Sequence, residues 1–348
     1  MFGYNNKIVK HDLEEISSLS LHWEELEGKC ILVTGANGML ATYLIYTFLY
    51  VAKNKNINIK IIALTRTLSK TQQLYKEFLN TDIFEILQQD ICTPINYPNN
   101  IDYIFHFAGN ASPYFIKNDP VGIVKSNLIG TFNVMEFAKN KRCKKIVFAS
   151  TREVYGETKY DTLHEDSFGK IDPLDNRSCY PESKRAAETI MKSYFLQYGI
   201  NCVIARIAHC YGPGMKIDND GRVMSDFIHN AVYNEDITLH SDGSAIRAFC
   251  YLSDAIQGLL ILLLYGKNGD AYNLANENEP LPIRDVAHII TDLFPERNIH
   301  VRFQKSEDNS GYCAYKRVGL SLEKINKLGY LPKISLREGL KRTILSFE

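Results

Sequence analysis

Short apolar runs alternate with longer helical stretches along this chain from residue 30 onward. The apolar residues within each run are nearly continuous, a pattern typical of strands buried on both faces. One predicted helix starts at Leu40, and another lies around Val121–Lys139. The predicted strands are Cys30–Thr34, Lys60–Leu64, Phe84–Gln88, Tyr103–Ala108, Lys145–Ser150 and Asn201–Ile207. Their alternation with helices indicates a parallel sheet, because right-handed crossovers place helices on both of its faces.

The pattern changes after about residue 209, where the turn signals YGPG, DNDG and SDGS cluster and the apolar segments shorten. We therefore predict an α/β fold, with a doubly wound parallel sheet and a smaller C-terminal α/β lobe. Residues 1–208 would form the sheet domain, with 241–265 returning to it, and residues 209–240 and 266–348 would form the lobe. Asp12–Ser18 is a predicted helix, and we expect the first 28 residues to pack against the chain's own sheet.

Composition narrows the class of protein. Of 348 residues, 45% are hydrophobic and 23% charged, as in ordinary globular proteins. Lys+Arg and Asp+Glu number 40 each, so no global charge favours nucleic acid or a membrane. Leu40–Ala52 and Leu259–Tyr265 are shorter than the roughly 20 apolar residues that cross a bilayer. The eight cysteines contain no C-x-x-C pair, and no signal-peptide pattern opens the sequence. We expect a cytoplasmic protein with free thiols and no metal site.

A glycine-containing turn follows the first predicted strand and leads directly into a helix. It consists of Thr34-Gly35-Ala36-Asn37-Gly38-Met39-Leu40-Ala41. Gly35 permits a tight turn, and Gly38 lets the backbone approach a pyrophosphate. The N-terminus of the helix then presents free N–H groups to the phosphates. The pattern predicts a dinucleotide-binding site lined by Gly35, Asn37, Gly38 and Met39.

The choice of cofactor depends on the end of the second predicted strand, which continues as Thr65-Arg66-Thr67. It lacks the acidic residue that would bind both ribose hydroxyls of NAD. Arg66 can instead bind the 2′-phosphate of NADP, although a solvated surface arginine or one stacked on adenine fits equally. We predict NADP or NAD, with NADP slightly favoured. Asp90 and Ile91, which follow the third strand, are placed to contact adenine.

The strongest chemical signal is Tyr180-Pro181-Glu182-Ser183-Lys184 at the start of a predicted helix. Residues four apart share one helical face, so Tyr180 and Lys184 lie together. A tyrosine has a pKa near 10, and we expect the Lys184 ammonium to lower the pKa of Tyr180 enough for it to accept a proton. Thr151 follows the fifth strand and is placed to bond the substrate oxygen that Tyr180 deprotonates.

Together these motifs resemble the extended short-chain dehydrogenases/reductases that modify nucleotide-sugars, over about residues 29–341. The resemblance is closest to UDP-glucuronate decarboxylases, with dTDP-glucose 4,6-dehydratases next. It implies a Rossmann fold, a tightly held nicotinamide, and a nucleotide-diphosphate sugar that is oxidised at C4 and later reduced again. We also predict a homodimer. The matching stretches are HFAGNASP (106–113), SNLIGTFNV (126–134), FASTREVYGE (148–157), NRSCYPESKRAAE (176–188), ARIAHCYGPGM (205–215), DGRVMSDFI (220–228) and SDGSAIRAFCYLSDA (241–255).

Matching positions imply the roles of further residues. Thr151, Tyr180 and Lys184 would run the hydride step, and Glu153 would work near C5 of the sugar. By the same match, the cofactor contacts would include Ala108. The substrate contacts would be Ser112 and the three arginines that line the nucleotide and diphosphate pocket, Arg222, Arg247 and Arg317. Arginine suits a diphosphate because its planar fork binds oxygens in pairs.

Two positions depart from the family pattern. Arg152 stands where the dehydratases carry an Asp and the decarboxylases usually carry a Ser. A guanidinium cannot act as the acid that expels a C6 hydroxyl, but it can hold a carboxylate. His209 stands where the family commonly has Asn, and we interpret it either as a ligand of a phosphate or sugar hydroxyl or as a packed core histidine.

Three functions follow from these residues. The first is decarboxylation of a nucleotide-hexuronate, UDP-glucuronate, because oxidation at C4 makes a β-keto acid that loses CO2 readily. The second is another nucleotide-sugar activity, namely a 4-keto reductase, an epimerase or an atypical dehydratase, in which Glu153 would remove the C5 proton. The third is a non-catalytic dinucleotide sensor on the same fold. The intact set of Thr151, Tyr180 and Lys184 disfavours the third, since a sensor needs no proton relay.

Overall fold

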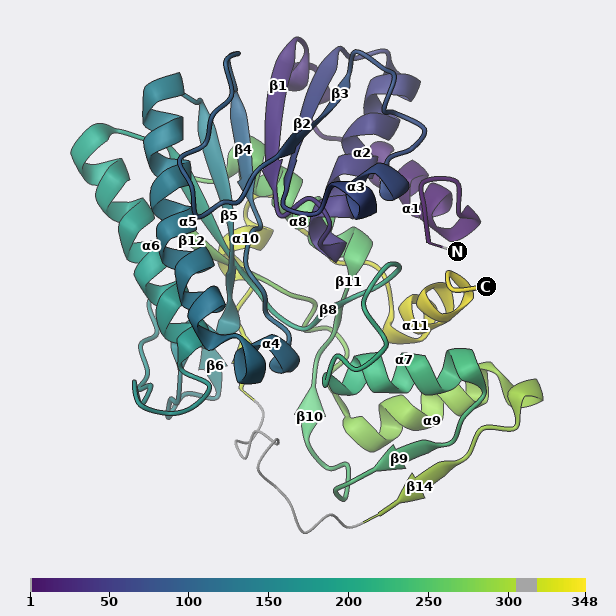
Figure 1. Cartoon of the computed structure of the whole chain (residues 1–348). Helices are drawn as coiled ribbons and strands as arrows, with labels where there is room; N and C mark the ends of the chain where they lie inside the picture. The colour runs from purple at the N-terminus through teal and green to yellow at the C-terminus, as the bar shows by residue number, and fades with distance from the viewer. Residues whose placement is uncertain (1, 305–317) are drawn as a thin grey trace.

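The centre of the molecule is a seven-stranded parallel sheet, seen in a computed structural model that describes residues 2–304 and 318–348 (Figure 1). All six predicted strands occur in it, and the doubly wound order confirms the predicted fold class. In spatial order the strands are β12 (Asp270–Leu274), β7 (Cys202–Ile207), β5 (Lys145–Thr151), β4 (Tyr103–His106), β1 (Lys29–Thr34), β2 (Ile59–Thr65) and β3 (Phe84–Gln88).

Of the seven strands in this sheet, the edge strand β12 is the one that the sequence pattern did not predict. It has only five residues and pairs in parallel with β7. Its Asn273 is fully buried and donates to the carbonyls of Leu163 and Ser321, both at 3.0 Å. A polar residue with buried partners interrupts the apolar run by which the other strands were found. The boundary predicted at residue 266 is therefore wrong for this segment, which belongs to the sheet.

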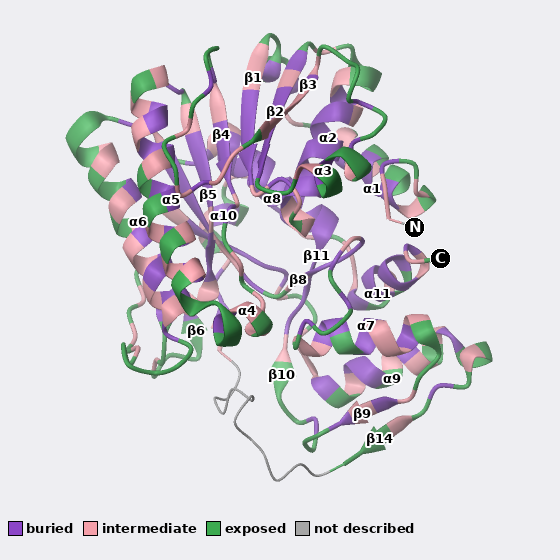
Figure 2. Cartoon of the chain, viewed as in Figure 1, coloured by how far each residue is buried: buried purple, intermediate pink, exposed green. Residues whose placement is uncertain are grey.

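Alternate residues of each strand face opposite helical layers. Ile31 and Val33 of β1 lie in the core beneath α2 (Met39–Lys55) and α8 (Leu252–Tyr265). Leu32 between them lies in the core beneath α5 (Pro120–Lys141) and α6 (Cys179–Tyr198). These three side chains are fully buried, which explains why the middle of the strand is continuously apolar. Figure 2 shows the buried strands between the two layers.

The helix of the N-terminal segment packs on other helices, whereas the prediction placed the segment against the sheet. The first helix, α1 (Lys7–Ser17), contacts α2 and α8 through Val9 and Leu13. It starts five residues earlier than predicted because the Asn6 side chain accepts hydrogen bonds from two N–H groups of the first turn. The segment thus adds a third layer outside α2 and α8.

The lobe lies beyond the carboxyl ends of the strands (Figure 1). Its own apolar core joins α7 (Val223–Tyr233), α9 (Ile283–Leu293) and α11 (Leu336–Leu345). Three two-stranded pairs of the described residues accompany it: β9 (Ile237–Leu239) with β14 (Val301–Phe303), β10 (Ile246–Arg247) with β13 (Leu281–Pro282), and β8 (Cys210–Tyr211) with β11 (Cys250–Tyr251). A further pair, β6 (Thr162–Leu163) with β15 (Gly319–Leu320), belongs to a separate small core with Val154 and Tyr155.

The remaining elements are short. They are the helices α3 (Leu68–Leu74), α4 (Pro113–Asn118) and α10 (Glu323–Asn326), and the 3-10 turns η1 (Trp23–Leu26), η2 (Arg152–Tyr155) and η3 (Pro295–Arg297). Among the helices of the described residues, none combines the length and the apolar character needed to span a bilayer.

Strand β4 ends at His106, two residues before the predicted end. The backbone N–H groups of Phe107 and Ala108 donate to the Thr34 hydroxyl, each at 3.1 Å, instead of continuing a strand ladder. The chain leaves the sheet here, beside the turn that follows β1. This is the edge at which parallel sheets of this order bind ligands.

Candidate active site

The turn between β1 and α2 has the backbone approach expected of a phosphate-binding loop. Gly35 adopts φ +67°, and a Cβ there would lie 2.9 Å from the backbone nitrogen of Ala108. Gly38 caps the N-terminus of α2, and a Cβ there would lie 3.3 Å from the carbonyl oxygen of Gly35. Met39 in the first helical turn packs against the core. Without side chains at the two glycines, a phosphate can approach the helix N-terminus.

Asn37 supports this turn through its side chain. Its amide nitrogen donates to the Thr65 hydroxyl at 2.8 Å, and its amide oxygen accepts from the Thr71 hydroxyl at 2.5 Å. The turn is thereby tied to the end of β2 and to α3. Because both groups of the Asn37 side chain are bonded within the chain, we expect any contact of this residue with a cofactor to come from its backbone.

Arg66 and Asp90 lie close together where β2 and β3 end. Arg66 Nη1 is 3.8 Å from Asp90 Oδ2, and the Arg66 side chain is 68% exposed. Ile91 is buried beside them and contacts Gly130 of α5. Arg66, which we predict to bind a 2′-phosphate, is therefore accessible, but the nearby Asp90 carboxylate partly compensates its positive charge.

The predicted proton-transfer residues meet at the carboxyl end of β5. Thr151 ends that strand, Tyr180 and Lys184 lie in the first turns of α6, and all three side chains are buried. Burial and the Glu153 carboxylate raise the pKa of Tyr180, while the hydrogen-bonded Thr151 hydroxyl and then Arg222 lower it. Thr151 thus lies within hydrogen-bonding reach of the Tyr180 phenol.

The Lys184 ammonium is held by strand β5. Its ammonium donates to the carbonyl of Ala149 at 2.8 Å and lies 4.5 Å above the Phe148 ring. Burial lowers the pKa of Lys184 to about 8, while the Glu188 carboxylate raises it. The expectation that Lys184 sets the pKa of Tyr180 is therefore not what the geometry shows, because the ammonium is bound to a carbonyl of β5.

Asn127 is a site residue that the sequence analysis did not single out. Its side chain is buried on α5, and its amide nitrogen donates to the Ser183 hydroxyl at 2.8 Å. Its amide oxygen has no hydrogen-bond partner in the described structure. A Cβ at Gly109 would lie 2.6 Å from this oxygen and 3.8 Å from Lys184 Nζ. Only the placement of Asn127 within the SNLIGTFNV stretch, and no chemical spacing, could have pointed to it.

These features fit a nicotinamide dinucleotide. Gly35 and Gly38 provide the approach for its diphosphate. Gly109, which has no side chain, separates the unpaired oxygen of Asn127 from the ammonium of Lys184. A buried acceptor without a partner is costly, so a ligand donor in this space would stabilise the site.

Glu153 follows Thr151 in the short turn η2. Its Oε2 is 3.7 Å from an Arg177 nitrogen, and both side chains are partly exposed. The surrounding protein raises the pKa of Glu153, while Arg177 and then Arg152 lower it. A carboxyl with a raised pKa beside the proton-transfer residues can both accept and return a proton.

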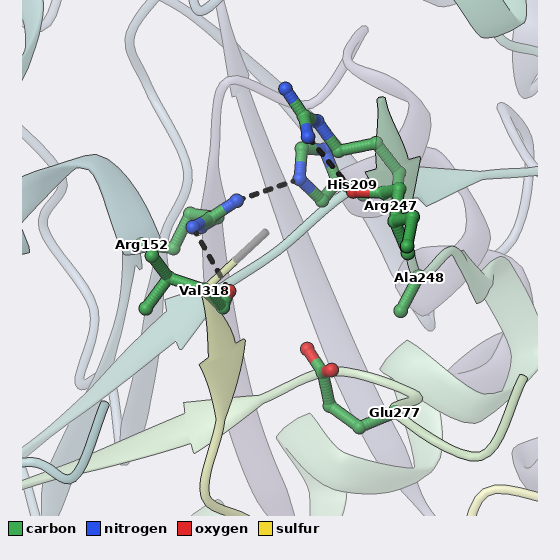
Figure 3. A pocket seen from close by; sticks show the side chains of 7 residues that line it. Arg152, His209, Arg247, Ala248, Glu277 and Val318 are labelled. Carbon is green, nitrogen blue, oxygen red and sulfur yellow. Dashed lines mark hydrogen bonds between the residues drawn. The ribbon is translucent and has the colours of Figure 1, made fainter. Parts of the chain in front are cut away.

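Arg152 and His209 line a small hollow of about 10 Å³ with Arg247 and Glu277 (Figure 3). Arg152 Nη1 donates to His209 Nε2 at 3.0 Å, and Arg152 Nη2 donates to the carbonyl of Val318 at 3.3 Å. Arg247 Nη1 donates to the carbonyl of Ile246 at 2.8 Å. His209 is exposed toward this space, so the alternative of a packed core histidine is wrong.

Two further predicted substrate residues lie where α4 meets the lobe. The Ser112 hydroxyl donates to the carbonyl of Asp220 at 3.2 Å. Arg222 pairs with the buried carboxylate of Asp220 at the start of α7. Arg222 also lowers the pKa of Tyr180, which places its charge near the proton-transfer residues. The remaining prediction, Arg317, lies outside the described residues.

Comparison with known proteins supports the same chemistry. The sequence profile of the NAD dependent epimerase/dehydratase family matches residues 31–275. UDP-glucuronic acid decarboxylase 6 of Arabidopsis thaliana is 35% identical over 310 residues, which cover 89% of this chain and 86% of the relative. The resemblance inferred from the motifs is thus confirmed.

Two solved structures share the fold. DesIV, a dTDP-glucose 4,6-dehydratase from Streptomyces venezuelae with NAD bound, has a TM-score of 0.75 at 21% identity, covering 91% of this chain and 96% of that one. UDP-glucuronic acid 4-epimerase from Bacillus cereus, in complex with UDP-glucuronic acid and NAD, has a TM-score of 0.74 at 23% identity, covering 90% and 98%. At these identities the likeness establishes the arrangement of sheet and lobe.

Proposed function

Because this chain belongs to the NAD dependent epimerase/dehydratase family, we propose that it decarboxylates UDP-glucuronate through oxidation of the sugar at C4. Membership makes it a nicotinamide-dependent enzyme that modifies nucleotide-sugars. One observation supports the decarboxylase activity above the others. Arg152 directly follows Thr151, and its side chain turns into the hollow that it shares with His209 (Figure 3), so a sugar carboxylate near the proton-transfer residues would meet its guanidinium.

Residues of β5 and α6 would carry out the proton transfers. Tyr180 takes the proton of the C4 hydroxyl, and Thr151 holds the same oxygen in place by a hydrogen bond. A bound oxidised nicotinamide would supply the hydride acceptor at C4, return that hydride later, and add a positive charge that favours the phenolate. Lys184, near neutral pH, can carry or release its own proton because its pKa is about 8.

Loss of CO2 then follows from the ketone. The C5–C6 bond breaks, its electron pair moves toward the C4 carbonyl, and the carboxylate leaves as CO2. Arg152 would hold that carboxylate before it leaves. Glu153, a partly buried acid with a raised pKa, would place a proton at C5 afterwards.

The nucleotide part of the substrate would bind between the sheet and the lobe. We assign the diphosphate to Arg222 and Arg247, with Ser112 beside them, and we keep residues 209–240 as part of the nucleotide-sugar-binding lobe. We assign the cofactor to the turn after β1 and to the space beside Gly109 and Lys184. The reacting sugar would therefore lie between Tyr180 and the lobe.

For the cofactor we propose a small preference for NADP over NAD. Arg66 is the residue that would bind the 2′-phosphate. Asp90, 3.8 Å away, keeps the preference small because its carboxylate competes for the same guanidinium.

We propose a homodimer formed through α5 and α6. Both helices lie on one outer side of the sheet and pack against each other. Their solvent face exposes large apolar side chains, which a second copy of the same face would cover. These side chains are Val121, Ile129 and Phe132 on α5 and Leu196 and Tyr198 on α6.

We place the protein in the cytoplasm. The seven cysteines that the structure describes are all free thiols. Thiols persist in reducing compartments, whereas secreted proteins use cysteine mainly in disulfides.

An epimerase is the second candidate. The observation that favours it is Glu153, whose raised pKa suits the removal and return of a C5 proton without loss of the carboxylate. The two activities differ in whether the C5–C6 bond breaks, so the mass of the product separates them.

The test is mass spectrometry of products after incubation of the full chain with UDP-glucuronate and either NAD or NADP. A product lighter by CO2 supports the proposal. A new chromatographic peak of unchanged mass supports the epimerase, and loss of water supports a dehydratase. A reductase leaves the substrate unchanged under these conditions, because the mixture contains neither a keto sugar nor a reduced nicotinamide. Tyr180→Phe is the matched control, since it removes the proton acceptor and keeps the ring.

A further inference from the structure

The two positions that depart from the family pattern are neighbours in space. Arg152 lies in η2 after β5, and His209 follows β7, which pairs with β5 in the sheet. Their side chains meet in the pocket of Figure 3, where Arg152 Nη1 is 3.0 Å from His209 Nε2. An arginine and a histidine therefore replace the family's small or acidic residue and its asparagine as a contacting pair.

The direction of this hydrogen bond fixes the state of the imidazole. A guanidinium can only donate, so His209 Nε2 must accept and carry no proton. The ring proton of the neutral form then lies on Nδ1. The protein environment, and after it the charges of Arg152 and Arg247, lower the pKa of His209 and so favour this neutral form. A protonated ring would lose the acceptor and repel both arginines.

The backbone holds the acceptor in a fixed place. His209 adopts φ +45°, a left-handed conformation in which histidine is more common than most residues. Its carbonyl accepts from the Cys250 N–H at 3.2 Å, which joins it to β11, and its ring lies 5.8 Å from the Phe249 ring. The preceding Ala208 N–H donates to the Leu274 carbonyl of β12 at 3.1 Å. The imidazole is thus placed by the sheet edge, and the longer Arg152 side chain is placed by the imidazole.

We infer that His209 is a positioning residue that holds Arg152 toward an anionic group of the substrate. The inference rests on the proposed function, in which that group is the sugar carboxylate. Arginine has many rotamers, and a fixed acceptor reduces the conformational entropy lost when the ligand binds. The pair therefore acts as one unit, and removal of His209 should matter only while Arg152 is present.

The test is a double-mutant cycle with Arg152→Ser, His209→Gly and the combined variant. Glycine tolerates the left-handed backbone, so the substitution removes the acceptor without adding strain. Affinities for UDP-glucuronate and UDP-glucose are measured by calorimetry in the presence of cofactor. Asn234→Gly is the matched control, because Asn234 has a similar φ of +57° at the end of α7 and is not among the residues that line this pocket.

In the wild-type background, His209→Gly should lower the preference for UDP-glucuronate roughly threefold to tenfold, as expected for one hydrogen bond. In the Arg152→Ser background, His209→Gly should leave the preference for UDP-glucuronate unchanged. Equal effects of His209→Gly in both backgrounds, or no effect in either, would contradict the inference. His209→Asn should retain part of the preference, since its amide oxygen also accepts.

Failure of the proposed function can be distinguished from failure of this inference. A wild-type chain that does not prefer UDP-glucuronate contradicts the decarboxylase, and the cycle is then evaluated on the affinity of whichever ligand binds. Nitrogen NMR of labelled histidines adds a readout that needs no ligand. The Nε2 signal of His209 should be that of an unprotonated acceptor and should shift in Arg152→Ser; an unchanged signal contradicts the pairing.

Discussion

Two clusters of charged side chains, one between α1 and α11 and one beside Arg152 at the carboxyl end of β5, are built differently. The first joins α1 to α11, where the fully buried Asp12 accepts hydrogen bonds from Tyr43, Tyr251 and Arg342. Arg342 also pairs with Glu15 and Glu338, which are partly exposed. The second cluster is the pocket of Arg152, His209, Arg247 and Glu277.

The difference concerns where the charge is neutralised. In the α1–α11 cluster the one buried acid meets the one buried base, and every oxygen of Asp12 has a donor from the chain itself. In the pocket the guanidiniums of Arg152 and Arg247 lie with the carboxylate of Glu277 and with an imidazole whose pKa is lowered by the protein environment and then by the two arginines. The first cluster is closed within the fold and stabilises it, whereas the second lines a hollow in which two guanidiniums accompany one carboxylate, an arrangement that suits an anionic ligand.

The largest effect is expected for Tyr180→Phe, at the chemical centre next to the pocket. The phenol oxygen takes the C4 proton, so the variant should lose turnover by at least about a hundredfold. Binding of UDP-glucuronate should stay nearly unchanged, because the ring remains buried. The measurements are product formation by mass spectrometry and binding by calorimetry. Substantial turnover in the variant would remove the dehydrogenase-type mechanism.

Arg342→Met tests the α1–α11 cluster. The substitution leaves the Asp12 carboxylate buried without its cation, which should lower the free energy of unfolding by about 3–5 kcal/mol. Urea denaturation measures this loss, and the preference between UDP-glucuronate and UDP-glucose should not change. Unchanged stability would show that the cluster does not support the fold.

Two variants accompany that measurement. Asp12→Asn combined with Arg342→Met should recover part of the stability, because the buried charge is gone while the tyrosine hydroxyls keep a partner. Arg302→Met is the matched control, since Arg302 forms an exposed pair with Asp236. Its loss should leave the denaturation midpoint nearly unchanged.

Arg152→Ser should give the opposite result to Arg342→Met. Removal of the pocket guanidinium should weaken UDP-glucuronate binding by about 1.5–3 kcal/mol and affect UDP-glucose little. Stability should fall less than in Arg342→Met, because Arg152 lines a hollow with the exposed His209, whereas Arg342 pairs with the fully buried Asp12. Tighter binding of a neutral sugar by the wild-type chain would favour the reductase or epimerase.

The sequence predicted the sheet well because burial on both faces leaves an unbroken apolar run for each strand. The prediction failed at β12. There Asn273 is buried, and its side chain donates hydrogen bonds to the carbonyls of Leu163 and Ser321, which lie far from it in the sequence. The prediction also missed that α1 packs on α2 and α8, since Asp12 is charged and its partners, among them Arg342, lie up to 330 residues away. Long-range partners of polar residues leave no periodic pattern.

The candidate site, like the fold, was predicted only in part. Thr151, Tyr180 and Lys184 come together as the motifs predicted, because strand ends and helix starts place them. Side-chain direction was not predictable: Lys184 donates to Ala149, and His209 accepts from Arg152. Both bonds depend on three-dimensional neighbours that residue spacing does not encode.

The smallest effect is expected at the surface pair of Arg66 and Asp90, which extends the comparison to charges exposed to water. Arg66 Nη1 is 3.8 Å from Asp90, and solvent screens both side chains. A 2′-phosphate contact from Arg66 should therefore be worth about 1 kcal/mol, so Arg66→Ala should lower the ratio of NADP to NAD affinity about fivefold. Cofactor titration followed by fluorescence measures both affinities. Asp90→Asn should shift the ratio the other way, because the guanidinium then loses its competing acid. Equal losses for NAD and NADP in Arg66→Ala would mean that Arg66 contacts the adenine or the solvent instead of the 2′-phosphate, and the preference for NADP would then be withdrawn.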